Sequence, residues 1–239
     1  MNLPIQNNTP LLNSLLEKAN NLPDANERYE AGKKAEYDAF WDAFQENGNR
    51  TGYNDAFKGH GWADANFRPK YDIKAVGNAL NLFANCIASN IKASLQACGV
   101  ILDTSKATSL NYAFSGSSSA ELPLIDCTGA STLTTVFSSA KLLSIDGVVL
   151  KEDGSQNVSA MFASCGALEN VTFSGKIGTN ISFDRCPKLS YDSLMSIINA
   201  LKDYSGSGST YTVTLGATNL AKLTDAEKQI ATQKGWTLA

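Results

Sequence analysis

The stretches MFASCGALENVTF, residues 161–173, and FDRCPKL, residues 183–189, share three side chains at equal offsets. In each stretch a Cys follows the Phe by three residues and a Leu follows it by six, and the second Phe comes 21 residues after the first. A recurrence at intervals of roughly 20 to 50 residues is typical of repeat proteins, whose units contribute equivalent side chains to a shared core. A pair of cysteines is also typical of a disulfide or a metal site, so the rest of the chain must decide between these interpretations.

The other phenylalanines extend this register toward the N-terminus. The recurring rings are Phe83, Phe114, Phe137, Phe162 and Phe183, at intervals of 31, 23, 25 and 21 residues. A small side chain lies three residues after each ring, in the order Cys86, Ser117, Ala140, Cys165 and Cys186. We therefore predict an internal structural ladder made of Phe83, Phe114, Phe137, Phe162, Phe183, Cys165, Cys186, Leu143, Leu168 and Leu189. The segments LPLID, LLSID and LENVTF that accompany these leucines are expected to be short β-strands.

Outside the repeats the chain has helical patterns. Residues 9–21 and 24–48 predict N-terminal helices, the second with an apolar stripe of Tyr37, Phe40, Trp41 and Phe44. Near the C-terminus, Ser190 and Thr224 are the expected N-caps of two further helices, and residues 210–215 and 236–239 are expected to pair as strands. The predicted organisation is a helical region (1–48), an aromatic-rich ordered loop (49–77), the repeats (78–190) and an αβαβ cap (191–239).

The repeats also resemble a known family. The segment LDTSKATSLNYAFSG, residues 102–116, together with VSAMFASC and ISFDRC, is similar to the repeat of BspA-like leucine-rich repeat proteins. Residues after Phe114 and Phe137 depart from it, because the family Cys is replaced by Ser117 and Ala140. The resemblance implies the fold class that we expect: α+β, an irregular leucine-rich repeat solenoid with a helical N-terminal region and an αβαβ C-terminal cap.

A second resemblance covers most of the chain. The order of YEAGKKAEYDAFWDAFQENGNRTGYNDAF, GHGW, PKYDI, the repeats, LMSIINAL and LTDAEKQIATQKGWTL is similar to the layout of proteins encoded in prophage tail regions of Firmicutes. This resemblance implies a phage tail-associated or cell-surface component. Its partners would be a protein or glycan on a cell surface, or other virion proteins.

Composition excludes some classes of function. The net charge is −3 with 18% charged residues, and no basic stripe predicts nucleic-acid binding. We see no signal peptide and no apolar run of the roughly 18 residues needed for membrane insertion. The expected location is the virion, or the cell surface if the chain is exported, and otherwise the cytoplasm.

No motif predicts an enzyme, a cofactor or a metal. The chain has five cysteines and one histidine, His60, which stands among glycines without a neighbouring nucleophile and acid. Because Ser117 and Ala140 occupy positions equivalent to Cys165 and Cys186, smallness explains these two thiols better than a disulfide or a metal does. We expect them to be reduced and buried.

The functional hypothesis is a non-enzymatic interaction or adhesion protein whose repeat surface binds protein or glycan. The candidate ligand face consists of the outward polar side chains Ser144, Asp146, Glu169, Asn170 and Thr172. One alternative is a structural assembly subunit whose N-terminal helices make an oligomer. The other is a glycan hydrolase that uses two of the carboxylates Asp64, Asp72, Asp126 and Asp146.

Overall fold

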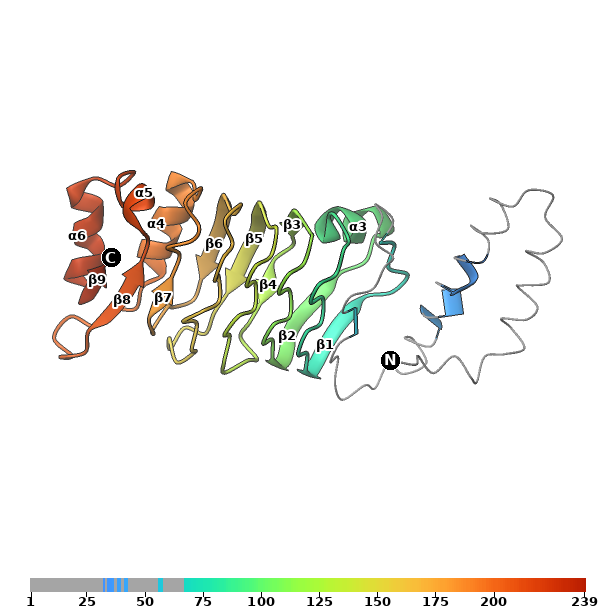
Figure 1. Cartoon of the computed structure of the whole chain (residues 1–239). Helices are drawn as coiled ribbons and strands as arrows, with labels where there is room; N and C mark the ends of the chain where they lie inside the picture. Colours follow the sequence, from blue (N-terminus) through green and yellow to red (C-terminus); the bar gives the residue numbers. More distant parts are fainter. Residues whose placement is uncertain (1–31, 33, 37, 40, 43–55, 58–66) are drawn as a thin grey trace. The chain divides into compact units, whose positions relative to one another are not determined.

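The computed structural model describes residues 32, 34–36, 38–39, 41–42, 56–57 and 67–239, and the chain divides into two compact units, Met1–Arg50 and Thr51–Ala239 (Figure 1). In the first unit, Trp41 is helical and buried. The rest of the predicted aromatic stripe and the helix over residues 9–21 lie outside the described residues, as do His60 and Asp64. The remainder of the fold concerns the second unit.

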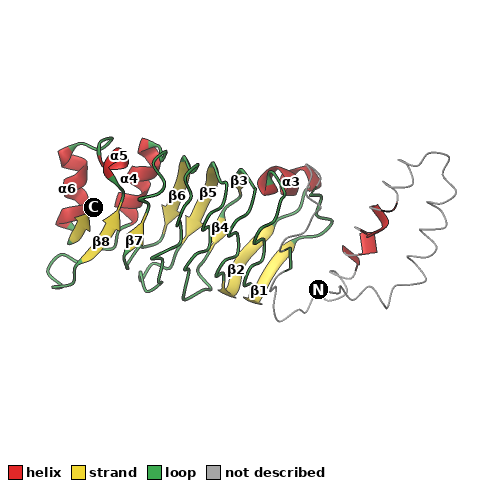
Figure 2. Ribbon diagram, viewed as in Figure 1, coloured by secondary structure: helices red, strands yellow, loops and turns green. Residues whose placement is uncertain are grey.

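The strands of the second unit pair in parallel within small sheets. In chain order its elements are β1 (Ile73–Asn78), α3 (Ile91–Cys98), β2 (Leu102–Ser109), β3 (Glu121–Leu122), β4 (Ile125–Asp126), β5 (Ser144–Val149), β6 (Asn170–Ser174), β7 (Ile181–Ser182), α4 (Tyr191–Ala200), β8 (Tyr211–Thr214), α5 (Ala217–Leu220), α6 (Asp225–Gln233) and β9 (Trp236–Leu238). One sheet pairs β1 with β2, a second has the order β3-β5-β4 with β6 also on β5, and a third has the order β7-β8-β9. Figure 2 shows strands β3–β6 in a row, with α3 at the β3 end of the row and α4–α6 beyond its β6 end.

The predicted fold class, an irregular leucine-rich repeat solenoid, is wrong. The structure has mixed α/β content, and its described strands form separate small parallel sheets. The αβαβ order predicted for the C-terminal cap omitted one element, the short helix α5, which lies between β8 and α6. Strands were correctly expected in LPLID, LLSID and LENVTF, which contribute to β3, β4, β5 and β6.

The sheets are interrupted because equivalent segments adopt different secondary structures. Seven residues after Phe83 and Phe183 lie Asn90 and Ser190, whose side chains accept hydrogen bonds from the N–H groups of Ala93 and Ser193 and cap α3 and α4. The segment IKASLQAC is rich in good helix formers, and YDSLMSIINA contains Leu, Met and Ala among residues of weaker helix propensity. The corresponding segments SIDGVV and NVTFS are rich in β-branched residues and form β5 and β6. The N-caps, together with local propensity, therefore favour helices at these two positions.

The phenylalanine rings form a continuous buried column. Phe83, Phe114, Phe137, Phe162 and Phe183 stack in order, with successive centroids 5.5, 5.6, 5.1 and 5.0 Å apart. Each of these rings is at most 1% exposed. The spacing of the phenylalanines alone indicated this arrangement. Phe57 continues the column, 4.7 Å from Phe83, and its sequence position did not indicate that role.

Each ring sits on a tight turn whose backbone bonds to the next segment. The N–H of Phe83 donates to the carbonyl of Ala113, and that of Phe137 donates to the carbonyl of Met161. The residue three positions after each Phe donates its N–H back to the carbonyl of that Phe, as Cys165 does to Phe162. These residues are Cys86, Ser117, Ala140, Cys165 and Cys186, and all are buried. Because these positions are buried in a tight turn, a small side chain fits there best.

One predicted member of the ladder is placed wrongly. Leu143 is 43% exposed, whereas Leu142 beside it is fully buried. Neighbouring residues of an extended chain point to opposite faces, so only one of the two leucines can enter the core. Leu168 and Leu189 are fully buried as expected.

Candidate functional site

The five residues of the predicted ligand face lie on or beside two adjacent strands. Ser144 of β5 pairs with Asn170 of β6 in parallel register. Asp146, Glu169, Asn170 and Thr172 are exposed, and Ser144 is half-buried. The Thr172 hydroxyl donates a hydrogen bond of 2.8 Å to the backbone carbonyl of Asp146. The structure thus brings these residues together on one surface, which we call the polar face.

A groove of about 460 Å³ lies between α3, the first half of β2 and the turn from β3 to β4. Its apolar lining consists of Leu95, Val100, Ile101, Leu102, Pro123 and Leu124, and its polar lining consists of Lys92, Gln96, Asp103, Thr104, Ser105 and Asp126. Ile101 is 54% exposed and Leu124 is 51% exposed. Single exposed aliphatic side chains are common, whereas here two of them line one groove.

The groove and the polar face are neighbours. Lys92, which lines the groove, makes an ion pair of 2.5 Å between its Nζ and Oδ1 of Asp146 in the polar face. The side chain of Leu124 lies against β5, with its Cδ1 3.7 Å from the position that a Cβ on Gly147 would take. Helix α3 contacts β3, which pairs with β5 (Figure 1). The groove and the polar face therefore adjoin at the Lys92–Asp146 ion pair.

The charged groups around the groove are held by specific local contacts. The hydrogen bond to Asp146 raises the pKa of Lys92, with further support from the charges of Asp146 and Glu121. Hydrogen bonds from the hydroxyl and the N–H of Ser105 lower the pKa of Asp103. Asp126 has an equivalent turn, in which Oδ1 accepts from the N–H and hydroxyl of Thr128. The turns fix these carboxylates beside the apolar lining.

Sequence reasoning missed the groove because it did not predict α3. The local signals were present: Asn90 is an N-cap residue and Gly99 ends the helix with a φ of 66°. Because the regularly spaced phenylalanines lie on both sides of this segment, we expected it to belong to the repeats (78–190). Lys92, Ile101 and Leu124 were consequently absent from the predicted site.

The paired cysteines have no role in this site. All five cysteines are free, and Cys165 and Cys186 are fully buried. The Cys165 thiol lies 2.9 Å from the carbonyl oxygen of Phe137 and is hydrogen-bonded to the neighbouring Cys186 thiol. That hydrogen bond, followed by burial, raises the pKa of Cys165. In the described part of the chain, no group of three or more His, Cys, Asp or Glu side chains is arranged to hold a metal ion.

The carboxylates considered for hydrolysis are engaged in separate contacts. Asp72 lies 3.3 Å from Lys74, Asp146 pairs with Lys92, and Asp126 accepts hydrogen bonds from Thr128. Each of these three carboxylates therefore has a different partner.

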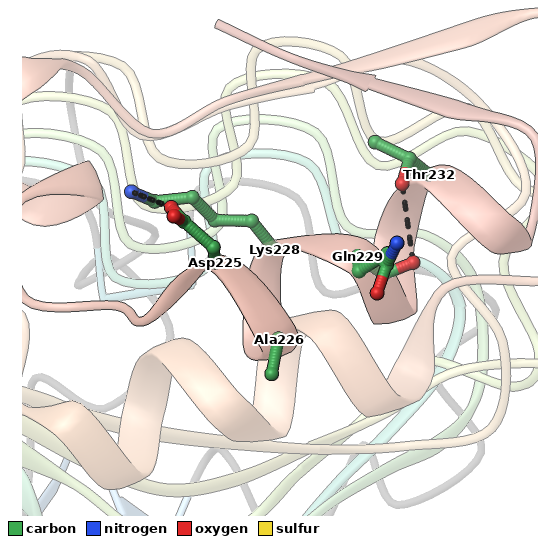
Figure 3. A pocket seen from close by; sticks show the side chains of 5 residues that line it. All are labelled: Asp225, Ala226, Lys228, Gln229 and Thr232. Carbon is green, nitrogen blue, oxygen red and sulfur yellow. Dashed lines mark hydrogen bonds and ion pairs between the residues drawn. The ribbon is translucent and has the colours of Figure 1, made fainter.

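A second hollow, of about 330 Å³, lies along the surface of α6 (Figure 3). It is lined by Asp225, Ala226, Lys228, Gln229 and Thr232. Lys228 pairs with Asp225 at 3.6 Å, and the Thr232 hydroxyl donates to the carbonyl of Gln229 within the same helix. All of the lining comes from one helix and its charged groups pair with each other, so this surface is a useful control for the groove.

No family model, no curated protein and no solved structure matches the chain. Among the helices in the described residues, none combines the length and the apolar composition that crossing a membrane requires.

Proposed function

We propose that this chain is a non-enzymatic interaction protein that binds a protein or glycan partner through the groove and the adjoining polar face. The observation that carries the proposal is the exposure of Ile101 and Leu124 in a groove whose rim is joined to the polar face by the Lys92–Asp146 ion pair. Ligand sites commonly combine an apolar lining with a few fixed polar groups. The groove has that composition.

The resemblance of the repeats to BspA-like proteins, and of the whole layout to prophage tail-region proteins of Firmicutes, favours a partner on a cell surface or in a virion. Under this proposal the chain acts as an adhesion or docking component. The buried column of phenylalanines holds the turns that precede β5 and β6, and these two strands carry the polar face. A rigid scaffold keeps the entropy lost on binding small.

The proposal is tested by measuring how much purified full-length chain binds to isolated Firmicutes cell walls. The face variant carries alanine at Ser144, Asp146, Glu169, Asn170 and Thr172, and the groove variant combines Ile101→Ser with Leu124→Ser. We expect each variant to lose most of the bound fraction. Treating the walls with protease or with periodate beforehand distinguishes a protein partner from a glycan partner.

A matched control variant changes Lys228, Gln229 and Thr232 of the α6 hollow to alanine. These residues lie on another surface and are not buried, so this variant should bind as the unaltered chain does. Far-UV circular dichroism and melting curves establish that each variant is folded. If the folded face and groove variants both bind as strongly as the control variant, the partner contacts another part of the chain and the proposal is wrong.

A further inference from the structure

We infer that the groove takes a polypeptide segment in which Lys or Arg side chains stand next to aliphatic ones. This inference rests on the proposed function and names the class of ligand for the same site. It follows from two independent properties of the groove, its aliphatic lining and the surplus of carboxylates around it.

The apolar lining favours a peptide over a sugar. The groove's apolar residues are Leu95, Val100, Ile101, Leu102, Pro123 and Leu124, and no aromatic ring is among them. A sugar ring typically packs its C–H groups against the electron-rich face of an aromatic ring, which the groove does not offer. Aliphatic side chains of a peptide instead fit a lining of Leu, Ile and Val, because the contact removes apolar surface of both partners from water.

The negative charge around the groove favours a ligand with positively charged side chains. Asp103 and Asp126 line the groove, and Asp146 and Glu121 adjoin it through Lys92. Lys92 is the cation in the lining, and Asp146 already neutralises it at 2.5 Å. At the β2 side, Lys74 and Lys106 lie near Asp103 and partly balance it. The surplus of negative charge is therefore greatest around Asp126, toward β4 and β5.

The carboxylate of Asp126 is held ready for such a ligand. Its Oδ1 accepts both hydrogen bonds from Thr128, at 2.9 and 2.6 Å, and within the described residues Oδ2 makes no further hydrogen bond. A guanidinium or ammonium group that enters the groove can bond to Oδ2 without breaking the turn. An acidic peptide would instead place like charges together, because Lys92, the cation in the lining, is already paired with Asp146.

The test is a selection of random twelve-residue peptides, displayed on phage, against the immobilised full chain. Peptides that bind the groove variant, Ile101→Ser with Leu124→Ser, are removed first. We expect the selected peptides to be enriched in Lys or Arg adjacent to Leu, Ile or Val. For the best of them, made synthetically, the charge variant Asp126→Asn with Asp146→Asn should weaken binding by about tenfold or more, and added salt should reduce the difference.

The Asp126→Asn change is matched to its purpose, because an amide oxygen still accepts the hydrogen bonds from Thr128 while the charge is removed. Selection of acidic or uncharged peptides that still require Ile101 and Leu124 would overturn the inference and leave the proposed function standing. So would wall binding that periodate abolishes and protease does not. If the first step removed every peptide that binds the unaltered chain, and the groove variant also bound cell walls fully, the inference and the groove's part in the proposed function would both be wrong.

Discussion

The ring of Phe137 stacks on the ring of Phe162 with centroids 5.1 Å apart and planes inclined by 25°. The contact lies in the middle of the aromatic column, and both rings are at most 1% exposed. The turns that carry these rings precede β5 and β6, so the column and the polar face are built from the same two segments. The stability of the column therefore determines how firmly the candidate site is held.

Replacing Phe137 with alanine removes a ring from the centre of this column. We expect a loss of about 3–5 kcal/mol in the free energy of unfolding, because the cavity has stacked rings on two sides. Urea denaturation followed by circular dichroism measures the change. The control is Leu143→Ala, which alters an exposed side chain and should cost less than about 1 kcal/mol. Equal losses for the two variants would contradict the role of the column.

Gly178→Ala should be poorly tolerated for steric reasons. A Cβ at this position would stand 2.0 Å from the carbonyl oxygen of Gly154, and that atom belongs to the backbone of the stacked segment. We expect a destabilisation of about 1–3 kcal/mol or more, seen as a lower melting temperature. The matched control is Gly166→Ala, whose Cβ would meet its nearest neighbour at 3.7 Å. A neutral Gly178→Ala variant would mean that the two segments are not in close contact.

The edge of β6 is covered by helix α4 through two serine hydroxyls. The N–H of Val171 donates to Oγ of Ser193 at 2.9 Å, and the N–H of Phe173 donates to Oγ of Ser196 at 2.8 Å. Ser193→Ala leaves the first N–H buried without an acceptor and should cost about 1–3 kcal/mol. It should also raise aggregation, because an uncovered strand edge can pair with another chain.

The control for this change is Asn199→Ala on the exposed side of the same helix. Alanine is the better helix former, so this variant should be as stable as the unaltered chain or slightly more stable. Denaturation midpoints and light scattering after heating compare the two variants. A Ser193→Ala chain with the midpoint of the Asn199→Ala chain would contradict the serine cover.

Asp103 makes the stability depend on pH in the acid range. Its pKa is lowered in the folded state by the hydroxyl and N–H of Ser105, so its charged form stabilises the fold above the unfolded pKa of about 3.9. That contribution is lost as the pH falls through the lower folded pKa. Asp103→Asn should therefore cost less than about 1 kcal/mol at neutral pH, and the loss should shrink below about pH 4. Urea denaturation at pH 7 and pH 3 measures it; a difference that grows on acidification would contradict this account.

The sequence was most informative where the same side chain must stack on itself. A ring at the Phe137 position is constrained by identical neighbours above and below, so its recurrence is visible in the chain. The small residue at Cys165 is constrained in the same way by the turn. The choice between Leu142 and Leu143 was not visible, because the two are chemically identical and only the geometry of the chain decides which one enters the core.

The division into separate sheets was harder to predict, because it depends on competition between local preferences. Asn90 and Ser144 occupy equivalent positions after their phenylalanines, yet one caps a helix and the other begins a strand. The groove exists because α3 forms at the first of these positions. The candidate ligand face was predicted from outward polar residues, whereas Lys92, Ile101 and Leu124 require knowledge of how α3 lies against β2 and β3.

The most direct test of the central claim is hydrogen–deuterium exchange of the full chain with and without a selected basic, aliphatic peptide. The account predicts slower exchange in residues 92–105 and 121–126, with the β5–β6 segment next in effect and α6 unchanged. The charge variant, Asp126→Asn with Asp146→Asn, should show little protection at the same peptide concentration. Protection confined to α6 or spread evenly over the chain, with the groove segments unchanged, would contradict the claim that the groove is the binding site.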